Sequence, residues 1–313
     1  MPTVSIRHKT TYRYRKPVSF GEHRMMLRPH EAPDQRLLGA QLIILPEPVQ
    51  VRALHDVFGN CVEVASFAGR WPLLCFESRA RLEHQPSSAF AACDEEIRTA
   101  RNGFRPFTYP EDELPDLERY IVPRCEDPAG ELAAWARRFI RPVGSTSLQT
   151  LLSDMTHAIR GEMAYGVRLH GPPQSPLETL ERGGGSCRDF AVLMIEAARM
   201  LGLAARFVSG YVYSGSPKAR ANGDRIGGGH THAWVSVYLP SCGWVEFDPT
   251  NGIVGNADLV RVATVRDARQ ALPLHGTWAG RASDFIAMEV EVDIHVEEAQ
   301  AETPPPALRM AKG

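Results

Sequence analysis

The chain has 313 residues, a formal net charge of −2 at pH 7, and a composition with 43% hydrophobic and 23% charged residues. These values are ordinary for globular proteins, they exclude a disordered or collagen-like chain, and the length favours about two domains. The near balance of 35 Lys and Arg against 37 Asp and Glu excludes a basic nucleic-acid footprint, so no nucleic-acid partner is expected.

Residues 1–84 are expected to form an antiparallel β domain. Apolar or aromatic residues alternate with polar ones from Val4 to Tyr14, which is the period-2 pattern of a half-buried strand. Further short apolar runs, separated by turns that contain Pro or Gly, predict more strands at 37–45, 51–54, 61–67 and 73–82. No group of side chains suited to catalysis stands out in this domain.

Residues 85–128 are expected to connect this domain to a second one. The stretch Gln85-Pro-Ser-Ser88 and the acidic, Pro-bounded stretch 110–115 are typical of linkers. From Ala129 the apolar residues follow the helical period, which predicts a first amphipathic helix that includes Leu132 and Phe139. We therefore expect the second domain to cover residues 129–297.

The second domain is expected to contain helices followed by strands. Ser147 and Ser175 have the character of helix N-caps, and Gly202 ends a buried helix that begins near Cys187. Three strands are expected after that helix, at 205–213, 232–239 and 244–247. The Gly- and Ser-rich stretch 215–229 predicts a mobile loop, the alternating run 286–296 predicts one more strand, and 298–313 is expected to be a disordered tail.

The sequence carries no sign of a membrane segment or an export signal. The longest apolar stretch, 191–208, is interrupted by charged residues, and the first residues lack the apolar run of a signal peptide. We therefore expect a cytosolic protein with no membrane partner. The six cysteines are too sparse for a disulfide scaffold, and no CxxC pair predicts a zinc ribbon.

Cys187 is the first candidate for chemistry. It lies at the first turn of the predicted helix and follows Gly183-Gly-Gly-Ser186. Free N–H groups at a helix N-terminus favour a thiolate and are able to hold an oxyanion, and glycines let a substrate backbone approach. The alternative is a structural thiol, since free cysteines are often buried.

His232 and Asp248 are candidate partners of that thiol. A thiolate nucleophile needs an imidazole to hold and return a proton, and alternation places His230 and His232 on the same face of one strand. If the two strands pair as a hairpin, Asp248 reaches the end where His232 lies and orients its ring, with Glu246 as the alternative carboxylate. A zinc site of His230, His232, Cys242 and Cys187 was also weighed, but the spacing matches no finger or ribbon.

These blocks, taken together, resemble the bacterial branch of the transglutaminase-like superfamily, which has a papain-like fold. The resemblance rests on Gly183–Ala191, Ala204–Tyr211, His232-Ala-Trp234 and Gly243–Asn251, and on the N-terminal stretches Ile6–Tyr14, Leu27-Arg-Pro and Asp56–Asn60. It implies an α+β fold, with the N-terminal antiparallel β domain followed by a core in which the Cys-bearing helix packs on an antiparallel sheet.

The resemblance also implies a catalytic triad and no cofactor. Cys187 would be the nucleophile, His232 the general acid and base, and Asp248 the orienting carboxylate; His232 is preferred to His230 because it occupies the HAW position. Tyr165 is a candidate second oxyanion donor, with core packing as its alternative. No metal is expected.

The triad predicts two-step acyl transfer on a peptide or protein amide through a thioester. Water as acceptor gives a cysteine peptidase or amidase, which is the first expectation. An amine as acceptor gives a protein-glutamine γ-glutamyltransferase that forms cross-links. A non-catalytic binding or scaffold module is the third alternative, and the oligomeric state is left open.

Overall fold

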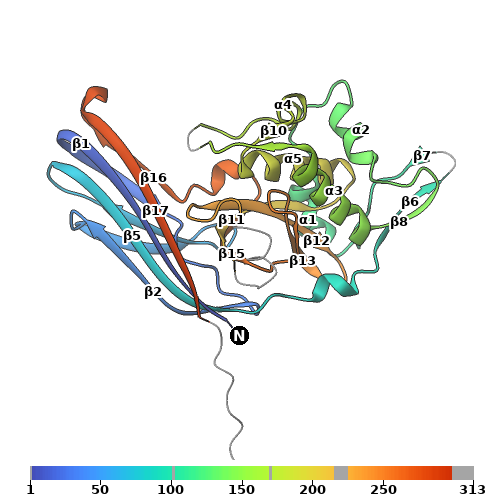
Figure 1. Ribbon diagram of the computed structural model, residues 1–313, viewed down its shortest axis with the longest axis horizontal. Coiled ribbons are helices and arrows are strands. Elements are labelled where there is room, and N and C mark those ends of the chain that lie inside the picture. Colours follow the sequence, from blue (N-terminus) through green and yellow to red (C-terminus); the bar gives the residue numbers. More distant parts are fainter. Residues whose placement is uncertain (1, 101–102, 169–170, 215–224, 298–313) are drawn as a thin grey trace, which may run out of the picture.

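The computed structural model describes residues 2–100, 103–168, 171–214 and 225–297. A curved sheet built around β1 lies beside an α+β region that contains the helices (Figure 1). The expected tail and most of the expected mobile loop, residues 215–224, fall outside the described residues. Among the helices that the structure describes, none combines the length and the apolar character needed to cross a membrane.

The long strand β1 (Thr3–Met25) organises the first region. Its first half pairs antiparallel with β5 (Trp71–His84) on one side and with β17 (Phe285–Glu297) on the other. The predicted alternation of burial is confirmed from Thr3 to Thr10, the strand itself continues to Met25, and the expected shorter strands are also present. The remaining strands of this sheet are β2 (Gln35–Leu45), β3 (Gln50–His55), β4 (Cys61–Ser66) and β16 (Leu274–Ala279).

The last two strands of the chain are found in an unexpected place. The run 286–296 forms a strand as predicted, but β17 and its neighbour β16 pair with β1 and not with the sheet of the second region. The expected second domain, residues 129–297, therefore includes two strands that belong to the sheet of the first region. Alternation of polar and apolar residues identifies a strand, but it does not identify the strand's partner.

Residues 85–128 are also packed more closely than a linker. They contain η1 (Ala89–Ala92), β6 (Glu96–Ala100), β7 (Gly103–Phe104) and α1 (Leu114–Ile121). Strand β6 pairs with β8 (Gly144–Ser147), and the side chains of Ile97 and Leu117 are buried. A few apolar anchors fix this segment although its composition is mostly polar.

The second region is an α+β core. Five antiparallel strands in the order β14-β13-β12-β11-β15 form its sheet, and α5 packs against β11 and β12. The predicted N-caps are confirmed, because Ser147 and Ser175 accept hydrogen bonds from the first turns of α3 and α4. The elements are α2 (Glu131–Arg137), α3 (Leu148–Glu162), β9 (Ala164–Tyr165), α4 (Pro176–Arg182), β10 (Gly184–Gly185), α5 (Cys187–Met200), β11 (Ala205–Val212), β12 (His232–Leu239), β13 (Gly243–Asp248), β14 (Ile253–Val254) and β15 (Leu259–Val265).

A shared apolar core joins the two regions. Val4 and Leu82 of the β1 sheet pack in one buried cluster with Tyr211 and Val260 of the second sheet. Hydrogen bonds cross the same interface, for example between His8 Nδ1 and the Tyr211 hydroxyl at 2.8 Å. Burial lowers the pKa of His8 to about 4, so this ring is neutral at pH 7. The interface therefore holds the β1 sheet at a fixed position beside the second region.

Candidate active site

Cys187 is the first residue of α5, as predicted, and the turn before it is rigid. The buried carboxylate of Asp189 accepts hydrogen bonds from the Ser186 N–H at 2.7 Å and from the Ser186 hydroxyl at 2.8 Å. Arg168 and the Gln174 N–H donate to its other oxygen, at 2.5 and 2.7 Å. These contacts fix the backbone from which the Cys187 side chain extends. The sequence analysis missed Asp189 and Arg168, although a capping box after Ser186 was a readable signal.

Two glycines before Cys187 are required by close packing. A Cβ on Gly184 would lie 2.6 Å from the carbonyl oxygen of Ala164, and a Cβ on Gly185 would lie 2.8 Å from the Asp189 Cβ. Strand β10, which these glycines form, pairs with β9 and so brings Tyr165 beside Gly185. The Gly-rich turn therefore allows the Tyr165 strand to run directly alongside the start of the Cys187 helix.

His232 and Asp248 meet at the end of the β12–β13 hairpin. Their strands pair as expected, and His232 Nε2 lies 2.8 Å from Asp248 Oδ2 in a fully buried contact. Burial by itself lowers the pKa of His232, but the charge and hydrogen bond of Asp248 raise it to about 10, with a smaller increase from Cys187. The imidazole is therefore protonated and positively charged at neutral pH.

The other ring nitrogen of His232 has no such partner. Nδ1 is buried and makes no hydrogen bond to any described residue. Cys187 lies near enough to raise the pKa of the ring, and both side chains line one cavity. The arrangement leaves one nitrogen fixed by a carboxylate and the other available to a thiol.

Asn251 supports this pair, and the sequence analysis did not identify it. Its amide nitrogen donates to Asp248 Oδ2 at 2.7 Å, while its side chain bonds both backbone groups of Ile226, at 2.9 and 3.0 Å. The Thr250 N–H donates to the second oxygen of Asp248 at 2.9 Å. Burial raises the pKa of Asp248, but the charge and bond of His232, helped by these donors, hold it below its ordinary value.

Two further residues confine the His232 ring. Trp234 stacks against it with ring centroids 5.9 Å apart and planes inclined by 29°. Gly227 lies against the other side, because a Cβ at that position would be only 2.6 Å from Nδ1, and its φ of +91° also favours glycine. The HAW motif thus contributes the ring and one of the surfaces that orient it.

The two alternative candidates for the triad, His230 and Glu246, do not take part in the His232–Asp248 contact. His230 lines the same cavity, but the residue that contacts Asp248 is His232. Glu246 pairs instead with Arg261, at 3.0 Å, and burial raises its pKa despite that partner. The structure therefore brings together Cys187, His232 and Asp248 and separates Glu246 from them.

Tyr165 lies at the site, as expected, but its role as an oxyanion donor stays a prediction. It is half-buried, lines the cavity with Cys187, and makes an edge contact with Phe190 at 6.4 Å between ring centroids. Burial, together with the charges of Cys187 and Asp248, raises the pKa of its hydroxyl to about 12. The hydroxyl therefore keeps its proton at neutral pH and is able to donate it in a hydrogen bond.

The cavity lies between the two regions of the molecule and has a volume of about 490 Å³. The second region contributes Cys187 and His232 to its lining. The β1 sheet contributes residues from two neighbouring strands, β1 and β17. Thr10 lies directly opposite Val290, and Tyr12 lies directly opposite Met288. We call these four residues the β wall. The β wall places an apolar surface across the cavity from the thiol.

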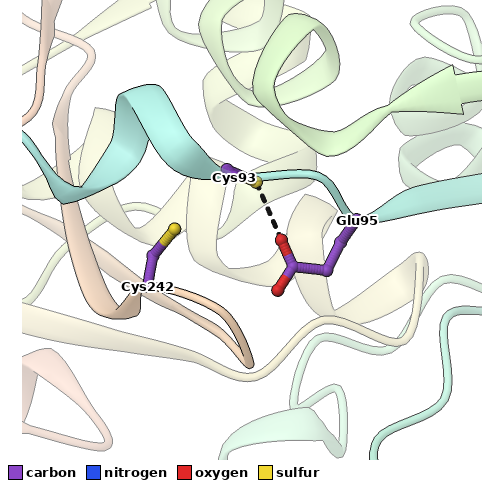
Figure 2. A group of neighbouring side chains, drawn as sticks. All are labelled: Cys93, Glu95 and Cys242. Carbon is purple, nitrogen blue, oxygen red and sulfur yellow. Dashed lines mark hydrogen bonds between the residues drawn. The ribbon is translucent and has the colours of Figure 1, made fainter.

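The four residues of the zinc alternative do not come together. Cys242 lies in the turn at the opposite end of the β12–β13 hairpin from Asp248, near Cys93 and Glu95 (Figure 2). His230, His232 and Cys187 line the cavity instead.

Comparison with known proteins agrees with this architecture. Residues 133–249 match the family model described as the transglutaminase-like superfamily, and residues 4–83 match the bacterial transglutaminase-like N-terminal region. An uncharacterized protein of Mycobacterium tuberculosis, Rv2569c, is 27% identical over 295 residues, which cover 92% of this chain and 91% of that protein. ML0607 of Mycobacterium leprae, also uncharacterized, is 32% identical over 133 residues. That match covers 42% of this chain and 46% of the relative, so the chain spans less than half of that protein.

A solved structure shares the whole fold. It is the crystal structure of a Cytophaga hutchinsonii protein proposed to be a cysteine protease, with a TM-score of 0.64 and 20% identity over 94% of this chain and 90% of that one. At this identity the likeness concerns the fold. The two matched regions, residues 4–83 and 133–249, show that the chain belongs to the transglutaminase-like superfamily and carries the N-terminal region of its bacterial members.

Proposed function

We propose that this protein is a cysteine-dependent enzyme that cleaves amide bonds by acyl transfer, with Cys187, His232 and Asp248 as its triad. The observation that carries the proposal is the state of the His232 ring. Asp248 holds Nε2, the ring is positively charged at neutral pH, and the buried Nδ1 is left without a partner in the described chain while Cys187 lies near. A thiolate beside an imidazolium is the pair that acyl transfer requires.

The proposed reaction has two steps. The Cys187 sulfur attacks the amide carbonyl carbon to form a C–S bond, the C–N bond breaks, and the leaving amine takes a proton from His232. In the second step His232 accepts a proton from the incoming acceptor, the acceptor attacks the thioester carbon, and the C–S bond breaks. Asp248 keeps the ring oriented throughout. N–H groups at the start of α5, with Tyr165, are the proposed donors to the oxyanion.

Hydrolysis is the proposed outcome. Water needs no binding site of its own, whereas transfer to an amine requires a second site that presents the amine to the thioester. The proposed activity is thus that of a cysteine peptidase or amidase, with a peptide or protein amide as substrate. We keep the cytosol as the proposed location, and fractionation of the native cells with an antibody to this chain would test it.

Mass spectrometry with a glutamine-containing peptide library tests the reaction. The purified protein is incubated with the library and a labelled primary amine, beside a Cys187→Ala control. Cleavage or deamidation that is absent from the control supports hydrolysis. Incorporation of the amine would instead identify a transferase that forms cross-links. If neither occurs and Cys187 reacts with iodoacetamide no faster than the buried Cys75, the scaffold alternative is the correct one.

The β wall extends the proposal to the substrate. Tyr12 and Met288 present apolar surface across the cavity from the thiol, and Leu272 and Leu274 line the same cavity. We propose that the enzyme prefers an amide with an apolar or aromatic side chain beside the reacting carbonyl. Deleting the β1 sheet is not a clean test, because its apolar core is shared with the second region.

Two alkylating reagents test the β wall without a known substrate. Iodoacetamide probes the thiol alone, and its N-benzyl derivative adds an aromatic group for the β wall. We expect Tyr12→Ala to slow the benzyl reagent at Cys187 several-fold and to leave iodoacetamide unchanged. Arg13→Ala is the matched control, since Arg13 is next on the strand and half exposed. Equal effects on both reagents would contradict a binding role for Tyr12.

A further inference from the structure

Three side chains from two distant segments converge outside the cavity (Figure 2). Cys93 and Glu95 belong to the segment after η1, and Cys242 belongs to the turn between β12 and β13. The two sulfurs and a carboxylate oxygen all lie within 4.8 Å of one another. We call this group the Cys–Glu cluster. The proposed reaction uses none of its members.

The Cys–Glu cluster is crowded with donor atoms and short contacts. The Cys93 thiol donates to Glu95 Oε2 at 3.0 Å, and the Cys242 thiol donates to the Ala89 carbonyl at 3.2 Å. The Ser241 hydroxyl donates to the same Glu95 oxygen at 2.9 Å and lies 3.2 Å from the Cys242 sulfur. Oxygen and sulfur atoms from both segments therefore surround one small volume.

The chemistry of these atoms favours a thiophilic cation. Zn²⁺ prefers thiolate, imidazole and carboxylate ligands in a four-coordinate arrangement, and structural zinc sites commonly take several cysteines. The Cys93 thiol already points at the Glu95 carboxylate, which it contacts at 3.0 Å, so a cation that replaces the thiol proton would meet both ligand atoms at once. One negative carboxylate and two ionisable thiols then offer enough charge to hold a divalent ion.

We propose that Cys93, Glu95 and Cys242 bind a thiophilic divalent cation, with Zn²⁺ as the first candidate. The fourth ligand is the Ser241 hydroxyl or a water molecule. On binding, each thiol releases one proton to solvent and forms a metal–sulfur bond, and no electron is transferred. The ion would fasten the segment after η1 to the hairpin that carries His232 and Asp248 at its other end.

Cobalt absorbance tests the site directly. All variants are made in the Cys187→Ala background, because a thiol beside His232 is itself a candidate ligand pair. The full chain, freed of metal with a chelator and kept reduced, is titrated with Co²⁺. We expect thiolate-to-cobalt charge-transfer absorbance that saturates at one equivalent and disappears when Zn²⁺ is added.

Substitutions within the Cys–Glu cluster should remove this signal. We expect Cys93→Ser and Cys242→Ser each to weaken Zn²⁺ binding at least 100-fold, and the milder Glu95→Gln to weaken it about 10-fold. Cys61→Ser is the matched control, since Cys61 is a half-buried cysteine of the β1 sheet. Zn²⁺ should raise the melting temperature of the background and control proteins but not that of the two cluster variants.

Two results would overturn the proposal. One is the absence of charge-transfer absorbance in the folded, reduced protein, or cobalt binding of unchanged affinity in all the cluster variants. The other is a disulfide between Cys93 and Cys242 in a non-reducing peptide map of freshly purified protein, which would make the cluster a redox pair. If a serine variant fails to fold, Glu95→Gln still decides the question, because the amide keeps the size of the carboxylate. The cobalt absorbance and the melting temperature are both independent of amide cleavage.

Discussion

The β12–β13 hairpin has a cysteine near each end, and the two thiols meet opposite charges. Near Asp248, the half-buried Cys187 lies beside an imidazole whose pKa is raised to about 10 and which is therefore positive. Beside the turn, the Cys93 thiol donates a hydrogen bond to the Glu95 carboxylate, and burial and this bond raise its pKa to about 12. This difference in partners is the physical basis for the two roles proposed above, attack on a carbonyl for Cys187 and cation binding for Cys93.

Removing the Asp248 carboxylate should have the largest effect on the difference between the two thiol environments. In Asp248→Asn the ring loses the group that makes it positive and orients it, so we expect turnover to fall on the order of 10³-fold or more. The measurement is turnover of a peptide identified by the library, with circular dichroism to verify the fold. Glu246→Gln is the control, because it alters another buried carboxylate of β13. Similar losses in both variants would argue that burial, and not the triad, is responsible.

Alkylation rates compare the two thiols, Cys187 and Cys93, directly. At pH 7 we expect iodoacetamide to modify Cys187 about 100-fold faster than Cys93, because Cys187 is half-buried at a helix N-terminus beside the positive His232 ring, whereas Cys93 is buried and bonded to a carboxylate. Peptide mass spectrometry over a time course measures both rates in one sample. Rates within a factor of three of each other would show that the two environments are equivalent.

Gly227 offers a smaller perturbation of the same ring. In Gly227→Ala the new Cβ meets His232 Nδ1, and the backbone is also strained, so we expect about a 10-fold fall in the Cys187 alkylation rate. Gly229→Ala carries similar backbone strain, with φ of +81°, but its Cβ meets only Val292 oxygen, at 4.0 Å. An equal fall in the control variant would assign the effect to strain alone.

The pH dependence of stability tests the charge on the same ring without any substrate or reagent. The folded pKa of His232, about 10, lies above its unfolded value of 6.5. The stabilisation is therefore complete below pH 6.5 and is lost as the pH rises through about 10. We expect the free energy of unfolding, measured by urea denaturation, to fall by about 3 kcal/mol more between pH 7 and 10 in the wild type than in His232→Gln. Parallel curves would mean that the ring is neutral.

Much of the site was predictable because its signals are local. The glycines before Cys187, the HAW strand and the position of Asp248 after a short turn predict a helix start and a hairpin, and the hairpin brings His232 to Asp248. Asn251 and Gly227 were not predictable in this way. Their importance depends on contacts between a loop and the end of a strand, and no periodicity encodes such contacts.

The parts of the fold that escaped prediction are long-range. Thr3 pairs with Glu297, and Cys93 meets Cys242, across separations for which the sequence offers no register signal. Short polar segments such as 85–128 are also misleading, because one or two buried side chains are enough to fix them. Strand patterns indicate that an element exists, and tertiary packing selects its partner.

The pairing of β1 with β17 sets an order of events during synthesis. Cys187, His232 and Asp248 all leave the ribosome before Met288 and Val290, which the β wall requires. Domains of a growing chain begin to fold from the N-terminal side, so the α+β region is able to assemble while β1 still lacks one neighbour. The β wall is complete only when the final strand is added, so a nascent chain carries the proposed nucleophile before it carries the proposed substrate-selecting surface.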